Sequence, residues 1–103
     1  MVIQITPTPE GVVARLSGDI SSEDAPRLGT ELGALTQSGG PVAVEMGAVG
    51  ALSAPGLAVL VATAEHFAQA GVELRFVGAR PALAPLLPTP RSRTSVSQDD
   101  AGS

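Results

Sequence analysis

The sequence predicts a small α/β domain in which a mixed four-stranded sheet packs against two main helices. The chain has 103 residues, of which 44% are hydrophobic, enough for one compact core but not for two domains. Four short segments alternate apolar and polar side chains, as half-buried strands do. Two longer segments with helical spacing separate the last three of them. We therefore expect one domain over residues 1–87 and a disordered tail over residues 88–103.

The first two strands are expected to form an antiparallel hairpin. Residues 2–6 alternate in polarity and are followed by Pro7, and Glu10 with Gly11 suits a turn into a second alternating segment, residues 12–17. Gly18 is expected to end this second strand.

A first helix is predicted over residues 23–37. Hydroxyl and carboxylate side chains precede it and suit the exposed amides and the positive end of a helix. Its apolar positions recur three and four residues apart, and the pattern is followed by glycines, which end helices. The apolar positions are Leu28, Leu32 and Leu35, and the glycines are Gly39 and Gly40.

A third strand over residues 41–46, a loop over residues 47–52 and a second helix over residues 55–70 are expected next, with Gly71 ending the helix. The first two turns of this helix are apolar on nearly every side, so the helix is buried or holds a partner. Ala58 and Ala62 fit either close packing on the sheet or a docking surface.

The fourth strand is predicted over residues 72–77. Glu45 and Arg75 have the same outward parity on strands that can be neighbours, so we expect a surface ion pair.

Pro85 limits any third helix after residue 81 to a short or broken turn. Beyond it, residues 91–103 hold one large apolar side chain, Val96, too little to offset the entropy of ordering them.

Composition argues against several classes of function. The net charge is −4 and the six basic residues, all arginines, are scattered, which disfavours nucleic-acid binding. The chain has no cysteine, and its one histidine, His66, falls on a polar stripe of the second helix. We expect neither metal, cofactor nor catalytic residue. Without a signal peptide or an apolar run of about 18 residues, a cytoplasmic protein that does not insert into a membrane is expected. The oligomeric state stays open.

The order and spacing of several short segments resemble the STAS domain, the fold of bacterial anti-sigma factor antagonists and of the cytoplasmic ends of sulfate transporters. The resemblance runs over residues 12–87, and no single segment is specific. The segments are residues 16–20, residues 25–28, residues 42–46 with Val49 and Leu52, Gly56 with Leu57, and residues 71–78.

In that family, the loop before the second helix reads Asp-Ser-Ser-Gly or Asp-Ser-Thr-Gly, and a partner kinase phosphorylates the hydroxyl residue that precedes the glycine. By resemblance, Ser53 stands at the aspartate, Ala54 at the first serine and Pro55 at the phosphoacceptor, while Gly56 and Leu57 match. Proline has no hydroxyl, so the usual site is not phosphorylatable. Two interpretations of Ser53 remain: a helix cap, with Pro55 suited to the first turn, or a displaced phosphosite.

The resemblance implies a non-enzymatic module that binds an anti-sigma factor or serine kinase of the histidine-kinase ATPase type and releases a sigma factor for transcription. The implied binding residues are Leu52, Ser53, Ala54, Pro55, Gly56, Leu57 and Ala58. One alternative is an accessory STAS subunit of a lipid or anion transporter. The other is an enzyme or ligand carrier whose site the sequence does not reveal.

Overall fold

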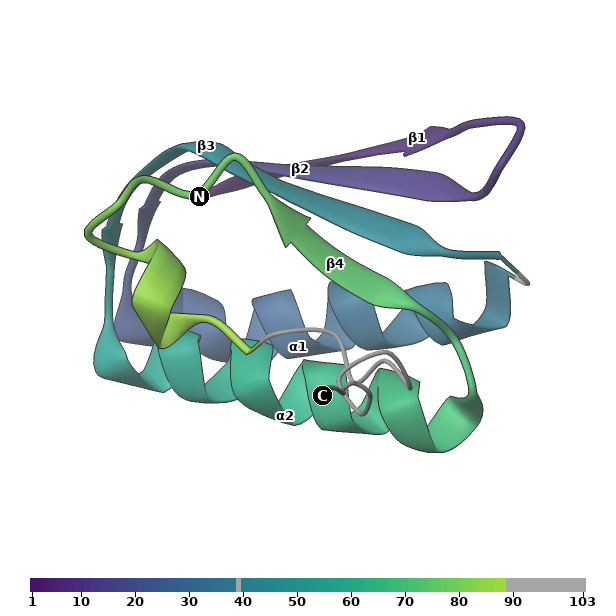
Figure 1. Ribbon diagram of the computed structural model, residues 1–103. Helices are drawn as coiled ribbons and strands as arrows, with labels where there is room; N and C mark the ends of the chain where they lie inside the picture. Colours follow the sequence, from purple (N-terminus) through teal and green to yellow (C-terminus); the bar gives the residue numbers. More distant parts are fainter. Residues whose placement is uncertain (39, 89–103) are drawn as a thin grey trace, which may run out of the picture.

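The chain folds into two layers, a four-stranded sheet and a pair of helices that cover one of its faces (Figure 1). The computed structural model describes residues 1–38 and 40–88. The predicted disordered tail therefore lies outside the described residues, apart from Pro88. The α/β class, the mixed sheet and the two main helices are confirmed.

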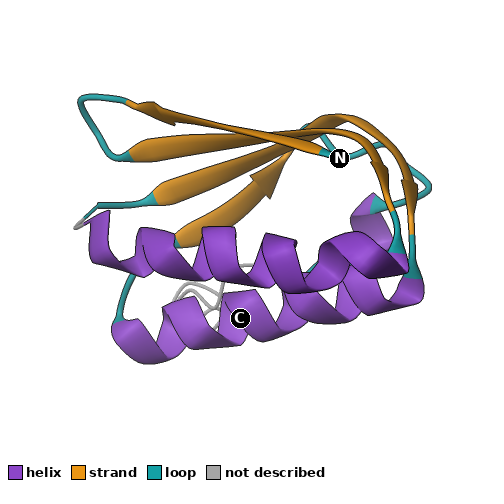
Figure 2. Ribbon diagram, turned by 180° about the vertical axis from the view of Figure 1, so that it is seen from behind, coloured by secondary structure: helices purple, strands orange, loops and turns teal. Residues whose placement is uncertain are grey.

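The sheet has the strand order β1-β2-β3-β4. Strand β1 (Val2–Pro7) pairs antiparallel with β2 (Val12–Ile20), as predicted, and Thr8 and Gly11 close the turn between them with two backbone hydrogen bonds of 2.7 and 3.2 Å. Strand β3 (Val42–Leu52) runs parallel to β2, and β4 (Leu74–Val77) runs parallel to β3. The carboxyl ends of β2 and β3 thus meet at one end of the sheet, where both strands curve down toward the helix starts (Figure 2).

Strands β2 and β3 are longer than predicted. Gly18 does not end β2, because its φ of +83°, which glycine adopts freely, lets the strand continue to Ile20. The predicted loop over residues 47–52 is also wrong, because these residues complete β3. The register shifts twice, between Arg15 and Ser17 and between Gly18 and Ile20 on β2, and each shift places an extra β3 residue opposite β2. Such bulges bend a strand and hide its alternation in the sequence.

The first helix lies where it was predicted, but only its central part is α-helical. Its α-helical part, α1, covers Ala25–Gly33, and short 3-10 turns precede and follow it at Ser22–Asp24 (η1) and Ala34–Ser38 (η2). The second helix, α2 (Ala54–Ala70), begins one residue before the predicted start and ends as predicted at Gly71, which has a φ of +74°.

The core lies between the sheet and the two helices. Each layer contributes one apolar face, so the core forms where the inward side chains of β2, β3 and β4 meet those of α1 and α2. Its largest fully buried side chains are Phe67, Leu16, Ile20, Leu28, Leu32, Met46 and Leu60. The buried leucines of α1 are Leu28 and Leu32, while Leu35 is half-buried in η2.

The end of the described chain folds back onto this core. Strand β4 begins at Leu74, two residues later than predicted, and a single 3-10 turn, Ala84–Leu86 (η3), stands where a short or broken helix was expected. The predicted Glu45–Arg75 ion pair does not form. Instead, Arg75 Nε lies 3.4 Å from a carboxylate oxygen of Glu73, because the register places Arg75 beside Ala43 and Glu45 beside Val77.

Candidate docking site at the corner between β3 and α2

The corner between β3 and α2 is held by backbone hydrogen bonds that leave little freedom to its single connecting residue, Ser53. The Ser53 amide donates to the Ile20 carbonyl at 2.9 Å and so fastens the corner to the end of β2. The Ser53 carbonyl accepts from the Leu57 amide at 2.9 Å and thereby makes the first helical bond of α2. The helix start is therefore positioned directly by the sheet.

The Ser53 side chain caps α2. Its hydroxyl oxygen accepts a hydrogen bond from the Gly56 amide at 3.1 Å, one of the amides that would otherwise lack a partner at the helix start. Pro55 lies in the first turn, where its lack of an amide hydrogen costs no helical bond. The structure confirms the helix-cap interpretation of Ser53.

Gly56 is the residue that lets the helix approach the sheet closely. It is buried, and a Cβ at this position would lie 2.9 Å from Cγ2 of Ile20 and 3.1 Å from the Ser53 hydroxyl oxygen. Gly56 adopts an ordinary helical backbone, so close approach rather than an unusual φ favours glycine here.

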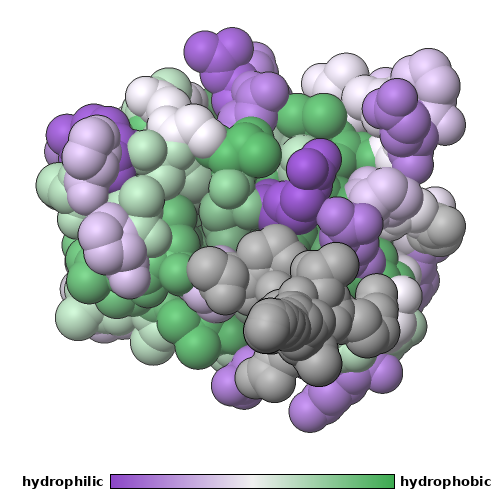
Figure 3. Space-filling view, in the orientation of Figure 1, coloured by the Kyte–Doolittle hydropathy of each residue, from purple (hydrophilic) through white to green (hydrophobic). Residues whose placement is uncertain are grey.

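The outward face of α2 is apolar over its first half. Its inward face buries Leu60, Thr63 and Phe67. The exposed positions of the first half carry only small or aliphatic side chains, and the space-filling view shows a largely hydrophobic surface over the start of α2 (Figure 3). These positions are Ala54, Pro55, Ala58, Val61 and Ala62, which we call the α2 outer face. Polar side chains return at Glu65, in the second half of the helix.

The seven residues implied by the family resemblance occupy three different environments. Ala54, Pro55 and Ala58 are exposed and belong to the α2 outer face. Leu52, Ser53 and Leu57 are half-buried, and Gly56 is buried. The structure adds Val61, whose side chain is 37% exposed, and it leaves Ala62 exposed like Ala58, so these two alanines do not pack on the sheet. The spacing of Val61 and Ala62, three and four residues from Ala58, is the sequence signal that predicts a shared face.

The last residues of β3 are braced from both sides. The Asp19 carboxylate, on β2, accepts a hydrogen bond from the Ala51 amide at 2.9 Å. The Arg80 guanidinium, in the segment after β4, donates to the Gly50 carbonyl. These side-chain bonds replace strand pairing where the second register shift interrupts it. The support for the corner is therefore a braced strand and not the predicted loop.

An acidic turn flanks the corner, because η1 contacts α2. In this turn the Asp24 carboxylate accepts hydrogen bonds from the backbone amide of Ser21 at 2.9 Å and from its hydroxyl at 3.0 Å. Both bonds favour the charged form and hold the pKa of Asp24 below its ordinary value of 3.8. Glu23, beside it, is exposed.

The remaining candidate sites have fewer features that point to a function. Within residues 1–38 and 40–88, no three histidine, cysteine or carboxylate side chains come together as metal ligands, and His66 is exposed, as predicted. An open hollow lies away from the corner, lined by Arg15, Glu45, Gly47, Ala48, Val77 and Gly78. In the part of the chain that the structure describes, no helix has the length and apolar character to cross a membrane.

Known proteins share both the sequence pattern and the fold. The family model described as "Mlab, STAS domain" matches residues 3–89. The structure of the anti-sigma factor antagonist SpoIIAA in its unphosphorylated form superposes with a TM-score of 0.69 at 12% identity, over 82% of this chain and 80% of that one. An anti-sigma factor antagonist STAS domain from Rhodobacter sphaeroides superposes with a TM-score of 0.64 at 12% identity, over 75% and 85% of the two chains.

No curated protein matches the sequence. At 12% identity the two structural likenesses establish the fold, and the family model, which spans most of the chain, establishes the family. This chain belongs to the STAS domain family.

Proposed function

We propose that this STAS domain is a non-enzymatic interaction module that binds an anti-sigma factor or serine kinase of the histidine-kinase ATPase type, and so regulates transcription through sigma-factor release. The observation that carries the proposal is the α2 outer face, an exposed row of small apolar side chains beside a rigid corner. Small side chains allow a partner's backbone to approach closely, and burying exposed apolar surface favours association.

We further propose that this binding cannot be switched off by phosphorylation at the position that the family usually modifies. A phosphate at a helix start would add nearly two negative charges to the α2 outer face and oppose docking by desolvation. Pro55, which occupies that position, has no hydroxyl. The same lack of an acceptor suits a permanent subunit, so our second candidate is an accessory subunit of a lipid or anion transporter.

The test is binding of the purified chain to purified anti-sigma factors and kinases of the histidine-kinase ATPase type from the same organism, measured by calorimetry. We expect Ala58→Asp to weaken binding at least tenfold, because it places a carboxylate on the α2 outer face. Ala68→Asp, on an exposed position in the last turn of the same helix, is the matched control and should bind like the unmodified chain. Equal affinity of Ala58→Asp and Ala68→Asp would overturn the docking site.

A second arm distinguishes the two candidate functions. If no such factor binds, while a membrane transporter encoded beside this gene co-purifies and Ala58→Asp disrupts that complex, the transporter role replaces the first proposal. If a kinase binds the chain, Pro55→Ser should make that binding sensitive to phosphorylation. The variant should bind the kinase without ATP and dissociate from it as the introduced hydroxyl is phosphorylated.

The Ser53 hydroxyl is our candidate for a displaced phosphosite, because it lies in the same corner two residues before Pro55. Incubation with the binding kinase and ATP, followed by mass spectrometry, tests it, and Pro55→Ser serves as the positive control. Phosphate on residue 55 of the variant without any on Ser53 of the unmodified chain would refute the displaced site and leave Ser53 as a helix cap alone.

A further inference from the structure

Strand β1 is a sheet edge with few of the features that usually prevent edge-to-edge pairing, and its one protective residue, Pro7, stands at its last position. It lies outermost in the strand order and pairs with β2 in an unbroken register over all six residues. Residues 1–9 carry no charged side chain and residues 2–6 no proline, whereas edge strands are commonly protected by lysines, prolines, bulges or shortness. The opposite edge, β4, has only four residues and is protected by its shortness.

The edge also exposes apolar side chains on both of its faces. On the face turned toward the helices, Ile3 packs against the core, but Ile5 lies beyond it and its side chain is 42% exposed. On the other face, Val2 is 53% exposed. Two of the four large hydrophobic side chains that are exposed in the described residues therefore belong to this one strand.

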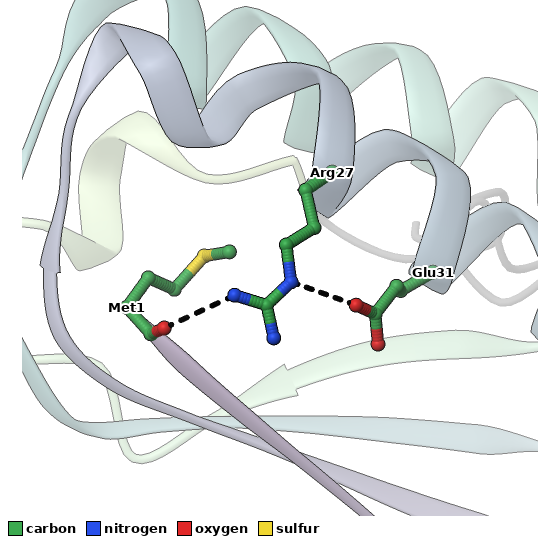
Figure 4. Close-up of polar contacts among 3 residues, drawn as sticks. All are labelled: Met1, Arg27 and Glu31. Atoms are coloured by element: carbon green, nitrogen blue, oxygen red, sulfur yellow. Dashed lines mark hydrogen bonds and ion pairs between the residues drawn. The ribbon is translucent and has the colours of Figure 1, made fainter.

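The start of β1 is held in place by α1. The Arg27 guanidinium donates a hydrogen bond of 3.5 Å to the Met1 carbonyl, and its Nε also binds the Glu31 carboxylate at 2.8 Å, so one side chain joins the helix to the strand (Figure 4). An edge strand that is already extended and anchored loses less conformational entropy on pairing than a loose one does.

We propose that β1 pairs with β1 of a second copy of this chain, antiparallel and about a two-fold axis through Gln4. An antiparallel two-fold pair places residue 4 opposite residue 4, residue 3 opposite residue 5, and residue 2 opposite residue 6. Directly opposed side chains share a face of the sheet. Ile3 then meets Ile5 of the second copy on the helix side, and Val2 meets Thr6 on the other side.

This register makes the strand self-complementary. Each exposed Ile5 gains an isoleucine neighbour from the second copy, and the unpaired amides and carbonyls of both edges gain partners, except at Pro7, which has no amide hydrogen to donate. The net charge of −4 opposes association only at a distance, because the strand itself holds no carboxylate. The two sheets become one eight-stranded sheet with all four main helices on the same face. The interaction does not involve the corner between β3 and α2 and does not depend on the proposed function.

Sedimentation equilibrium of the full chain, from about 10 µM to about 1 mM, tests the proposal, since a contact of this size lies at the weak end of specific interfaces. We expect a monomer–dimer equilibrium in this range. Gln4→Lys should weaken it at least tenfold, because two lysines would face each other across the axis. Gln69→Lys, the same change at an exposed position near the end of α2, is the matched control and should dimerise normally.

Charge reversal distinguishes a lost contact from a damaged fold. Gln4→Lys and Gln4→Glu should each be monomeric with an unchanged circular dichroism spectrum, and an equimolar mixture of the two should form a heterodimer. A chain that stays monomeric to about 1 mM, oligomers larger than a dimer, unweakened dimerisation of Gln4→Lys, or a mixture that fails to associate would each overturn the two-fold β1 pairing.

Discussion

The Asp19 carboxylate accepts a hydrogen bond from the Ala51 amide at 2.9 Å, across the strand pair that supports the corner between β3 and α2. The residues lie 32 positions apart in the chain. At this point one β2 residue faces two of β3, so the side chain supplies the acceptor that the strand backbone does not.

We expect Asp19→Ala to lower the free energy of unfolding by about 1 kcal/mol, because the Ala51 amide loses its acceptor. Asp19→Asn keeps an oxygen in place and should lower it less. Urea unfolding measures both variants, and faster hydrogen exchange at the Ala51 amide in Asp19→Ala would locate the effect. Equal loss of stability in the two variants would contradict the role of the carboxylate oxygen.

Two glycines on helices should respond to alanine in opposite directions. At Gly56 a Cβ would lie 2.9 Å from Ile20 Cγ2, so we expect Gly56→Ala to cost about 1 to 3 kcal/mol through overpacking. At Gly33 such a Cβ would have no atom within 4 Å apart from its chain neighbours and the backbone of its own helix, so Gly33→Ala should stabilise the chain by about 0.5 to 1 kcal/mol through helix propensity. Chemical denaturation gives both values, and a stabilising Gly56→Ala would show that α2 can move away from the sheet freely.

Removing the helix cap should have a moderate cost. We expect Ser53→Ala to destabilise the chain by about 1 kcal/mol, because the Gly56 amide loses the hydroxyl that it binds at 3.1 Å. Ser53→Asp should retain most of the stability, since aspartate is also a favourable cap and carries an acceptor beside the positive end of the helix. Thermal unfolding of the three proteins provides the comparison, in which Ser53→Asp should lie nearer to the unmodified chain.

Asp24 should contribute to a loss of stability in acid. Hydrogen bonds from the Ser21 amide and hydroxyl hold its folded-state pKa below the ordinary value of 3.8. A group with a depressed folded-state pKa contributes stability above its unfolded pKa, and that contribution is lost as the pH falls through the folded pKa. The melting temperature between about pH 2 and pH 6 should therefore fall less steeply with acid in Asp24→Asn. Ser21→Ala keeps the amide donor, so its slope should lie between those of the unmodified chain and Asp24→Asn. Identical slopes in all three proteins would contradict the role given to Asp24.

The boundary of the domain is predicted to lie at residue 87. Leu83 and Leu87 are each only 8% exposed and pack against the core, although they belong to an irregular segment. Truncation after residue 88 should leave cooperative thermal unfolding intact, whereas Leu87→Ala in the full chain should cost about 2 to 3 kcal/mol. A lower melting temperature after truncation would mean that residues beyond 88 stabilise the fold.

Much of the fold could be predicted from the sequence, because its signals are local. Alternation marked the first strands, and the leucines at helical spacing marked α1. Ser53 and Gly71 marked the ends of α2 within one residue. The second half of β3 could not be predicted in this way. Its glycines and small side chains resemble a loop, and only pairing with β2 and the braces from Asp19 and Arg80 hold it extended.

The candidate site, too, could be predicted only in part from the sequence. The resemblance marked the seven residues of the corner, but the sequence did not separate exposed Ala58 from buried Gly56, because both are small and both lie on an apolar helix. Exposure depends on which neighbours cover each side of that helix. The expected Glu45–Arg75 ion pair failed for a related reason, since outward parity sets the face of a side chain but the strand register sets its neighbour.

The sequence by itself determined the α/β class, the number of strands and main helices, the cap at Ser53 and the absence of a hydroxyl at position 55, because these follow from side-chain chemistry and short-range spacing. Only the tertiary structure decided which face of α2 stays open, how β3 is braced and that β1 forms an edge of the sheet. Those properties depend on contacts between residues far apart in the chain.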